Sequence, residues 1–119
     1  MCLSTVDAPI APEGSTIVLH EDPVIEGYLV RLLARRGYRV VKARVCQALE
    51  MVRSGAVSLV ITNAPESFAS VAERVALLYL SASPNPALVA AFPRSFTLPK
   101  PFHPEDFYEA VRELSSAGA

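Results

Sequence analysis

Five short apolar runs alternate with segments of helical pattern along the chain, and this alternation constrains the fold more than any other feature. The runs cover residues 16–20, 39–43, 58–63, 76–80 and 95–98. Each run is short, rich in aliphatic residues and bounded by turn-forming or polar residues, so each is predicted to be a strand. Strands that alternate with helices favour a parallel sheet with helices on both faces. The sequence therefore predicts an α/β domain.

The segments between the strands carry start and stop signals for helices. The first helix is predicted to begin at Pro23, because Asp22 is a capping residue and proline suits the first helical position. Gly37 is predicted to end it. Further helices are expected at 47–53 and at about 67–75, with a stub at 86–91 and a last helix that opens at His103. The last helix should bury the apolar stripe Phe107, Ala110, Val111 and Leu114.

Length and composition indicate one globular domain. The chain has 119 residues, of which 51% are hydrophobic, enough for a core. Residues 1–14 contain prolines without an apolar period and are expected to form a flexible leader, so the domain is placed at 15–119. No secretory signal and no membrane span is predicted, and Cys2 and Cys46 suggest neither a disulfide framework nor a metal knuckle. A cytoplasmic protein is therefore expected.

The net charge of −1 argues against a dedicated nucleic-acid binder. Six of the eleven basic residues nevertheless lie between positions 31 and 44: Arg31, Arg35, Arg36, Arg39, Lys42 and Arg44. The first interpretation is a solvated face, with Arg35 and Arg36 at the carbonyl end of a helix. A docking patch for a partner is the alternative.

Three sequence pieces, taken together and in order, carry a family resemblance. They are Ile-Val-Leu-His-Glu-Asp-Pro at 17–23, Gly-Tyr-Arg-Val at 37–40 and Leu-Pro-Lys-Pro-Phe at 98–102. With Asp106-Phe107 and Ala110-Val111 following the last piece, residues 16–114 resemble the receiver domain of bacterial two-component response regulators. The resemblance implies a flavodoxin-like, doubly wound, five-stranded parallel sheet of order 2-1-3-4-5. Fewer residues separate Asn63 from Ser81 than in receivers, which implies a shortened third helix, and the stub at 86–91 implies a shortened fourth helix.

The resemblance also implies a site at the carboxyl ends of the strands. In receivers, an acidic pair after the first strand holds Mg²⁺ and an aspartate after the third accepts a phosphoryl group. A hydroxyl after the fourth strand and a lysine after the fifth bind the phosphoryl oxygens, and an aromatic residue before the lysine acts as a switch. In this chain the corresponding residues are His20 and Glu21 with the neighbouring Asp22, Asn63, Ser81, Lys100 and, at the switch position, Thr97.

Asn63 stands where phosphoryl transfer needs a carboxylate. A neutral carboxamide is a poor nucleophile, and His20 replaces one of the oxygen ligands that Mg²⁺ prefers. No metal or other cofactor is therefore expected, although Glu21 and Asp22 could hold Mg²⁺ weakly. Lys100 is predicted to form an ion pair with Glu21 or Asp22, because an unpaired buried lysine is unfavourable. The sequence further predicts that His20 packs at the sheet edge with a backbone partner.

These residues lead to a function hypothesis without enzymatic activity. The chain is predicted to be a pseudo-receiver of a two-component or phosphorelay pathway, which contacts protein partners independently of phosphorylation. One alternative is a receiver that accepts the phosphoryl group on a displaced carboxylate, Glu21 or Asp22. Another is a small α/β ligand-binding protein or enzyme on a borrowed scaffold. The expected contact surface, for a partner or a homodimer, comprises Leu88, Val89, Phe92, Phe96, Tyr108 and Arg112.

Overall fold

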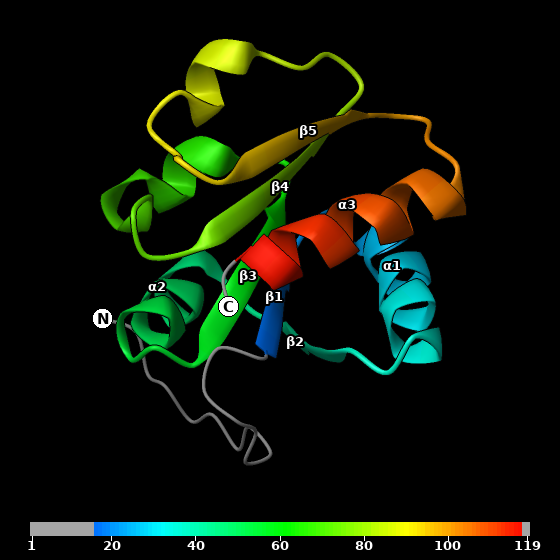
Figure 1. The fold of residues 1–119 in the computed structure, drawn as a ribbon, viewed down its shortest axis with the longest axis horizontal. Coiled ribbons are helices and arrows are strands. Elements are labelled where there is room, and N and C mark those ends of the chain that lie inside the picture. Colours follow the sequence, from blue (N-terminus) through cyan, green and yellow to red (C-terminus); the bar gives the residue numbers. More distant parts are fainter. Residues whose placement is uncertain (1–15, 118–119) are drawn as a thin grey trace.

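A computed structural model describes residues 16–117 of the chain, so the leader at 1–14 and Cys2 lie outside the described residues. Five strands form one sheet: β1 Thr16–His20, β2 Arg39–Lys42, β3 Val57–Thr62, β4 Ala76–Ser81 and β5 Ser95–Pro99. All neighbours pair in parallel, in the order β2-β1-β3-β4-β5 (Figure 1). The predicted fold class and strand order are confirmed.

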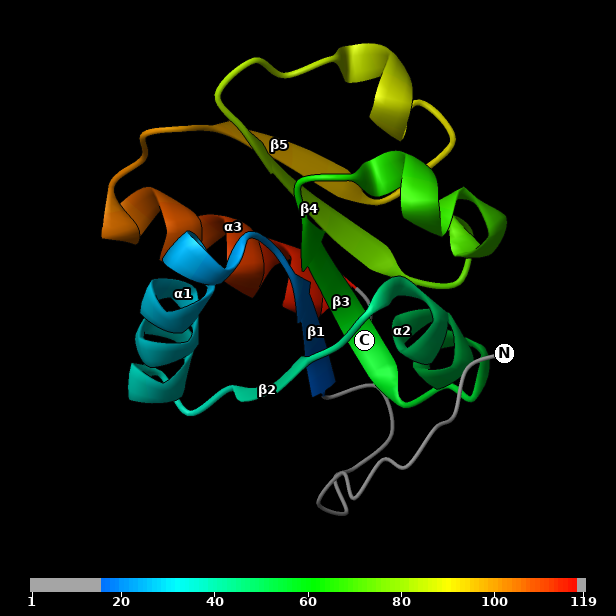
Figure 2. The ribbon, with the colours of Figure 1, turned by 180° about the vertical axis from the view of Figure 1, so that it is seen from behind.

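Helical elements cover both faces of the sheet (Figures 1 and 2). The α-helices α1 Pro23–Arg35 and α3 Pro104–Ala117 pack on one face, around a core that includes Leu29, Leu78 and Phe107. On the other face lie α2 Val45–Arg53 and the 3₁₀ helices η1 Pro65–Val71 and η2 Pro86–Val89. The central strands β3 and β4 are buried almost throughout, as expected for a parallel sheet that is covered on both sides.

The first helix begins and ends where the sequence predicts. Pro23 is its first residue, and its last turn closes with two hydrogen bonds, from Gly37 N to Ala34 O at 3.0 Å and from Tyr38 N to Leu33 O at 3.1 Å. This pair of bonds is a Schellman motif, which requires a left-handed residue after the cap. Gly37 supplies it with φ +80°.

The segments between β3 and β5 depart from the prediction in detail. The helix expected at 67–75 is instead the 3₁₀ helix η1 at Pro65–Val71, and the stub expected at 86–91 is the shorter η2. A 3₁₀ helix rises about 2.0 Å per residue against about 1.5 Å for an α-helix. A 3₁₀ helix therefore covers the same distance along the sheet with fewer residues. Shortened third and fourth helical segments are thus confirmed, and both are 3₁₀ helices. Helix α2 also begins at Val45, two residues before the predicted start.

Within the described part of the chain, we find no helix with both the length and the apolar character that a membrane crossing requires.

Candidate functional site

The residues singled out in the sequence gather where the strands end, at the carboxyl-terminal end of the sheet. We call this end the carboxyl edge, as distinct from the edge strands β2 and β5. The strands β1, β3 and β4 end at His20, Thr62 and Ser81, and Lys100 directly follows β5. Parallel strands bring their carboxyl ends to the same edge, where α/β proteins place their functional groups. A hydrogen bond from Lys100 N to Ser81 O, 2.9 Å long, joins the ends of β5 and β4. The fold therefore assembles this edge from four separate strands.

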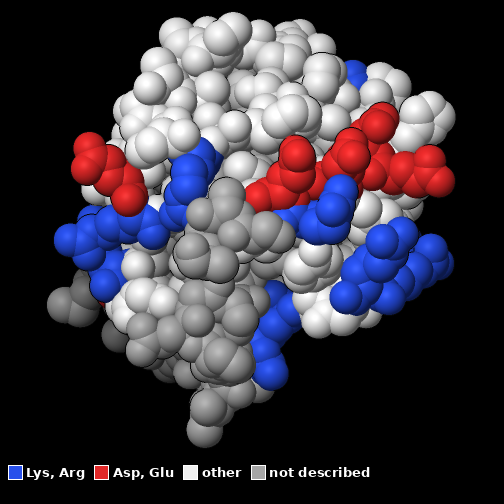
Figure 3. Space-filling model, in the orientation of Figure 1, with Lys and Arg blue, Asp and Glu red and all other residues white. Residues whose placement is uncertain are grey.

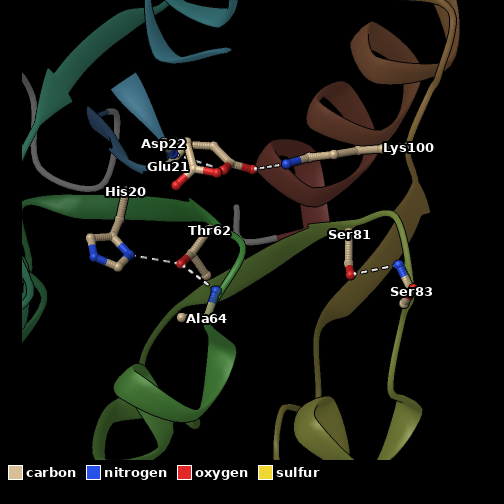
Figure 4. Close-up of polar contacts among 8 residues, drawn as sticks. All are labelled: His20, Glu21, Asp22, Thr62, Ala64, Ser81, Ser83 and Lys100. Atoms are coloured by element: carbon tan, nitrogen blue, oxygen red, sulfur yellow. Dashed lines mark hydrogen bonds and ion pairs between the residues drawn. The ribbon is translucent and has the colours of Figure 1, made fainter. Parts of the chain in front are cut away.

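An ion pair between Lys100 and Glu21 crosses the edge (Figure 4). The Lys100 Nζ lies 3.0 Å from Glu21 Oε2, and the Glu21 side chain is fully buried whereas that of Lys100 is 23% exposed. The other carboxylate oxygen of Glu21 accepts the Asp22 N–H at 2.9 Å. Oε2 has no hydrogen-bond partner among the described residues, so its compensation is the charge of Lys100. The predicted ion pair is present, with Glu21 as the partner and Asp22 exposed to solvent.

His20 contacts a side chain that the sequence did not single out. Its Nδ1 lies 2.9 Å from Thr62 Oγ1, which also accepts the Ala64 N–H at 2.9 Å (Figure 4). The imidazole meets the ring of Phe68 edge-on, with ring centroids 5.6 Å apart. The prediction that a backbone group satisfies His20 was wrong, because the register of β1 and β3 places Thr62 directly opposite His20. A pattern within one strand cannot reveal that pairing.

Asn63, Ser81 and Thr97 occupy the positions expected from the strand order. Asn63 follows β3, is half-buried, and its side chain makes no hydrogen bond to a described residue. The Ser81 Oγ accepts the Ser83 N–H at 3.0 Å (Figure 4). Thr97 lies half-buried in β5, opposite Tyr79 of β4. Phe96 beside it is 45% exposed.

A depression adjoins this edge on the side of β2. Its volume is about 510 Å³, and it is lined by His20, Glu21, Glu26, Lys42, Ala43, Arg44, Val45 and Gln47. Lys100 and Asn63 do not line it. Across residues 16–117, no three His, Cys, Asp or Glu side chains are grouped so that they could hold a metal ion.

Comparison with known proteins places the fold. The signal receiver domain of an HD domain-containing protein from Pseudomonas fluorescens Pf-5 superposes with a TM-score of 0.72 at 23% identity, over 95% of each chain. Chemotaxis protein CheY4 of Vibrio cholerae gives a TM-score of 0.72 at 18% identity, over 84% of this chain and 98% of that one. The fold is that of a response-regulator receiver domain.

A third receiver fold, the response regulator receiver protein from Sinorhizobium medicae WSM419, matches with a TM-score of 0.70 at 21% identity, over 90% of this chain and 98% of that one. No protein-family model matches the sequence, and no curated protein matches it either. The likeness therefore lies in the backbone of the receiver fold, and the three structures share 23% sequence identity or less with this chain.

The expected contact surface on the receiver fold is only partly at the surface. Phe92 is 5% exposed and belongs to the core, so including it was wrong. Leu88 and Val89 are half-buried against the same core because η2 is short and lies close to the sheet. Tyr108 donates its hydroxyl to Leu32 O at 2.7 Å. The residues that remain open to solvent are Phe96 and Arg112.

Proposed function

We propose that this protein is a receiver-like signalling domain that acts through protein contacts and does not accept a phosphoryl group. The proposal is based on which side chains stand at the carboxyl edge and on how they are paired. Asn63 follows β3 where a phosphoacceptor would stand, and Glu21, the one buried acidic residue within 16–117, is paired with Lys100. A carboxamide offers little nucleophilicity, and a lysine that neutralises a carboxylate is not free to receive a phosphoryl oxygen.

The donor set at this edge does not fit Mg²⁺. Mg²⁺ takes oxygen ligands in near-octahedral order, usually carboxylates and water. Here His20 offers an imidazole that is bound to Thr62, and Glu21 directs one oxygen to Lys100 and the other to the Asp22 N–H. Asp22 alone has an exposed carboxylate. These groups are therefore unsuited to phosphoryl transfer assisted by Mg²⁺.

The proposal is tested by incubating the protein with acetyl phosphate and Mg²⁺ and measuring its intact mass. We expect no mass gain of one phosphoryl group in the wild-type protein. The matched positive control is the double variant His20→Asp/Asn63→Asp, which restores both carboxylates on the receiver fold and should become labelled in a Mg²⁺-dependent way. The double variant differs from wild type only at the carboxyl edge, so labelling reports on those groups.

Two results would contradict the proposal. A stoichiometric, hydroxylamine-sensitive adduct on the wild-type protein would favour the displaced-carboxylate alternative, and its loss in Glu21→Gln or Asp22→Asn would identify the acceptor. Turnover or tight binding of a small molecule that depends on the β2-side depression would favour a ligand-binding protein on a borrowed scaffold.

A further inference from the structure

The sheet ends at β2, whose sole neighbour among the described residues is β1. Ala43 donates its N–H to Leu19 O at 3.3 Å, so the backbone groups of odd-numbered residues in this strand face β1. Backbone direction alternates along a strand, and the N–H and C=O of Val40 and Lys42 therefore point to the open side. Such an unpaired row is a template on which another extended chain can add as a strand.

Three cationic side chains flank this open row, and we call Arg39, Lys42 and Arg44 the β2 basic edge. Val41 packs into the core on the α2 face and Val40 into the core on the α1 face. By the alternation of side chains, Arg39 lies on the α2 side and Lys42 on the α1 side. Arg44 follows the strand and lines the same depression as Lys42. A strand added here would thus meet positive charge on both of its faces.

The charges of the β2 basic edge are not used within the described part of the fold. The ion pairs in residues 16–117 are Lys100 with Glu21 and Arg112 with Glu109. None of the three cations lies within ion-pairing distance of a described carboxylate, and Lys42 and Arg44 are exposed. No ion pair within residues 16–117 therefore accounts for their clustering.

The depression beside the carboxyl edge extends this site. Lys42 and Arg44 line it together with Glu21 and Glu26. Because Lys100 already balances Glu21, Glu26 is the one acidic side chain that opposes the two cations there. The end of an added strand would enter a hollow with net positive charge.

We propose that the β2 basic edge binds an extended acidic segment of a partner protein, which adds to the sheet beside β2 with its carboxylates on Arg39, Lys42 and Arg44. This deepens the proposed function by naming a class of partner. The two are tested apart, because phosphoryl labelling reports on the carboxyl edge and peptide binding reports on β2. Failure of one therefore leaves the other standing.

Charge decides between this partner and two other occupants. A second copy of the chain would bring basic side chains against basic side chains at β2, which is unfavourable. A nucleic-acid duplex is a long polyanion. The acidic residues along α3 form a band next to the basic side chains (Figure 3), and this band would repel a duplex that extends beyond the basic side chains. Those acidic residues are Glu105, Asp106, Glu109 and Glu113. A short acidic peptide matches three cations and two open backbone positions without reaching that band.

The probe is a fluorescein-labelled heptapeptide of alternating glutamate and valine, measured by fluorescence anisotropy against the full chain. We expect saturable binding that weakens as salt is raised, because the charges are exposed. Arg39→Glu/Lys42→Glu should raise Kd by roughly tenfold or more. The matched control Arg53→Glu/Arg74→Glu reverses two exposed charges away from β2 and should leave Kd unchanged. Circular dichroism establishes that each variant is folded.

A second arm tests strand addition separately from charge attraction. The same peptide, N-methylated at alternate amides along the edge that faces β2, keeps its charges and cannot pair, so its binding should be lost. The amides of Val40 and Lys42 should gain protection from hydrogen exchange with the unmethylated peptide. Four results would each overturn the proposal. They are absence of binding, an equal loss of binding in the control variant, equal binding of the N-methylated peptide, and tighter binding of a DNA duplex. Absence of binding together with aggregation of Arg39→Gln/Lys42→Gln would mean that the charges only guard the edge.

Discussion

Glu21 is the residue on which the carboxyl edge depends most. Its side chain is fully buried, and Oε2 relies on the charge of Lys100. A buried ion pair contributes little compared with neutral groups of the same shape, but removal of one partner leaves an uncompensated charge. The intact pair therefore adds little to the free energy of unfolding. Removal of either residue alone is destabilising, because the other charge is then left buried without a partner.

Replacement of Lys100 should expose this penalty. We expect Lys100→Met to lower the free energy of unfolding by about 2 kcal/mol, below the usual range for a fully buried pair because Lys100 is partly exposed. Adding Glu21→Gln removes the stranded charge and should restore most of the loss. Urea denaturation of the two single variants and the double variant measures the coupling. Strictly additive effects would show that the two charges do not interact.

At the scale of elements, local signals decided most of the fold. Asp22-Pro23 and Gly37 act within one turn of the chain, and they set the bounds of α1 as predicted. The 3₁₀ character of η1 was missed because it follows from the distance that a short connection must span. Thr62 was missed for a related reason, since its contact with His20 depends on strand register. The Lys100–Glu21 pair could be predicted because charge balance at a known sheet edge leaves few partners.

Two glycines of α1 and its cap should respond oppositely to the same substitution. Gly37 has φ +80°, where a Cβ is strained although no atom lies near it, so Gly37→Ala should lower the free energy of unfolding by about 1 kcal/mol. Gly27 lies within the helix, where an added Cβ would meet only Arg31 at 3.9 Å. Gly27→Ala should raise the free energy of unfolding by about 0.5–1 kcal/mol. Thermal or urea unfolding of both variants is the measurement, and equal signs would contradict the assignment of the helix end.

At the scale of the whole molecule, charge is unevenly distributed over the face that Figure 3 shows. Basic side chains lie over the C-terminal end of α1 and over β2, acidic ones along α3, and the region over η2 and β5 is almost uncharged (Figure 3). In the sequence, Arg94 is the one charged residue between Arg74 and Lys100. The two edges of the sheet thus differ in character, because β2 repels a second copy of itself whereas β5 presents no like charges to one.

The uncharged β5 edge should support weak self-association of the protein. Phe96 is 45% exposed there, and Lys100 N bonds to β4, so the backbone groups of Ser95 and Thr97 point to the open side. We expect sedimentation velocity to show a concentration-dependent shift toward dimer for the wild type, and Phe96→Glu to abolish the shift by placing two carboxylates face to face. Val24→Glu is the matched control, because Val24 is 95% exposed and lies on α1, outside β5. A shift that persists in Phe96→Glu, or a wild-type protein that stays monomeric, would contradict self-association through β5.

Binding of the acidic peptide should be the same in Phe96→Glu as in the wild type, because β2 lies at the opposite edge of the sheet.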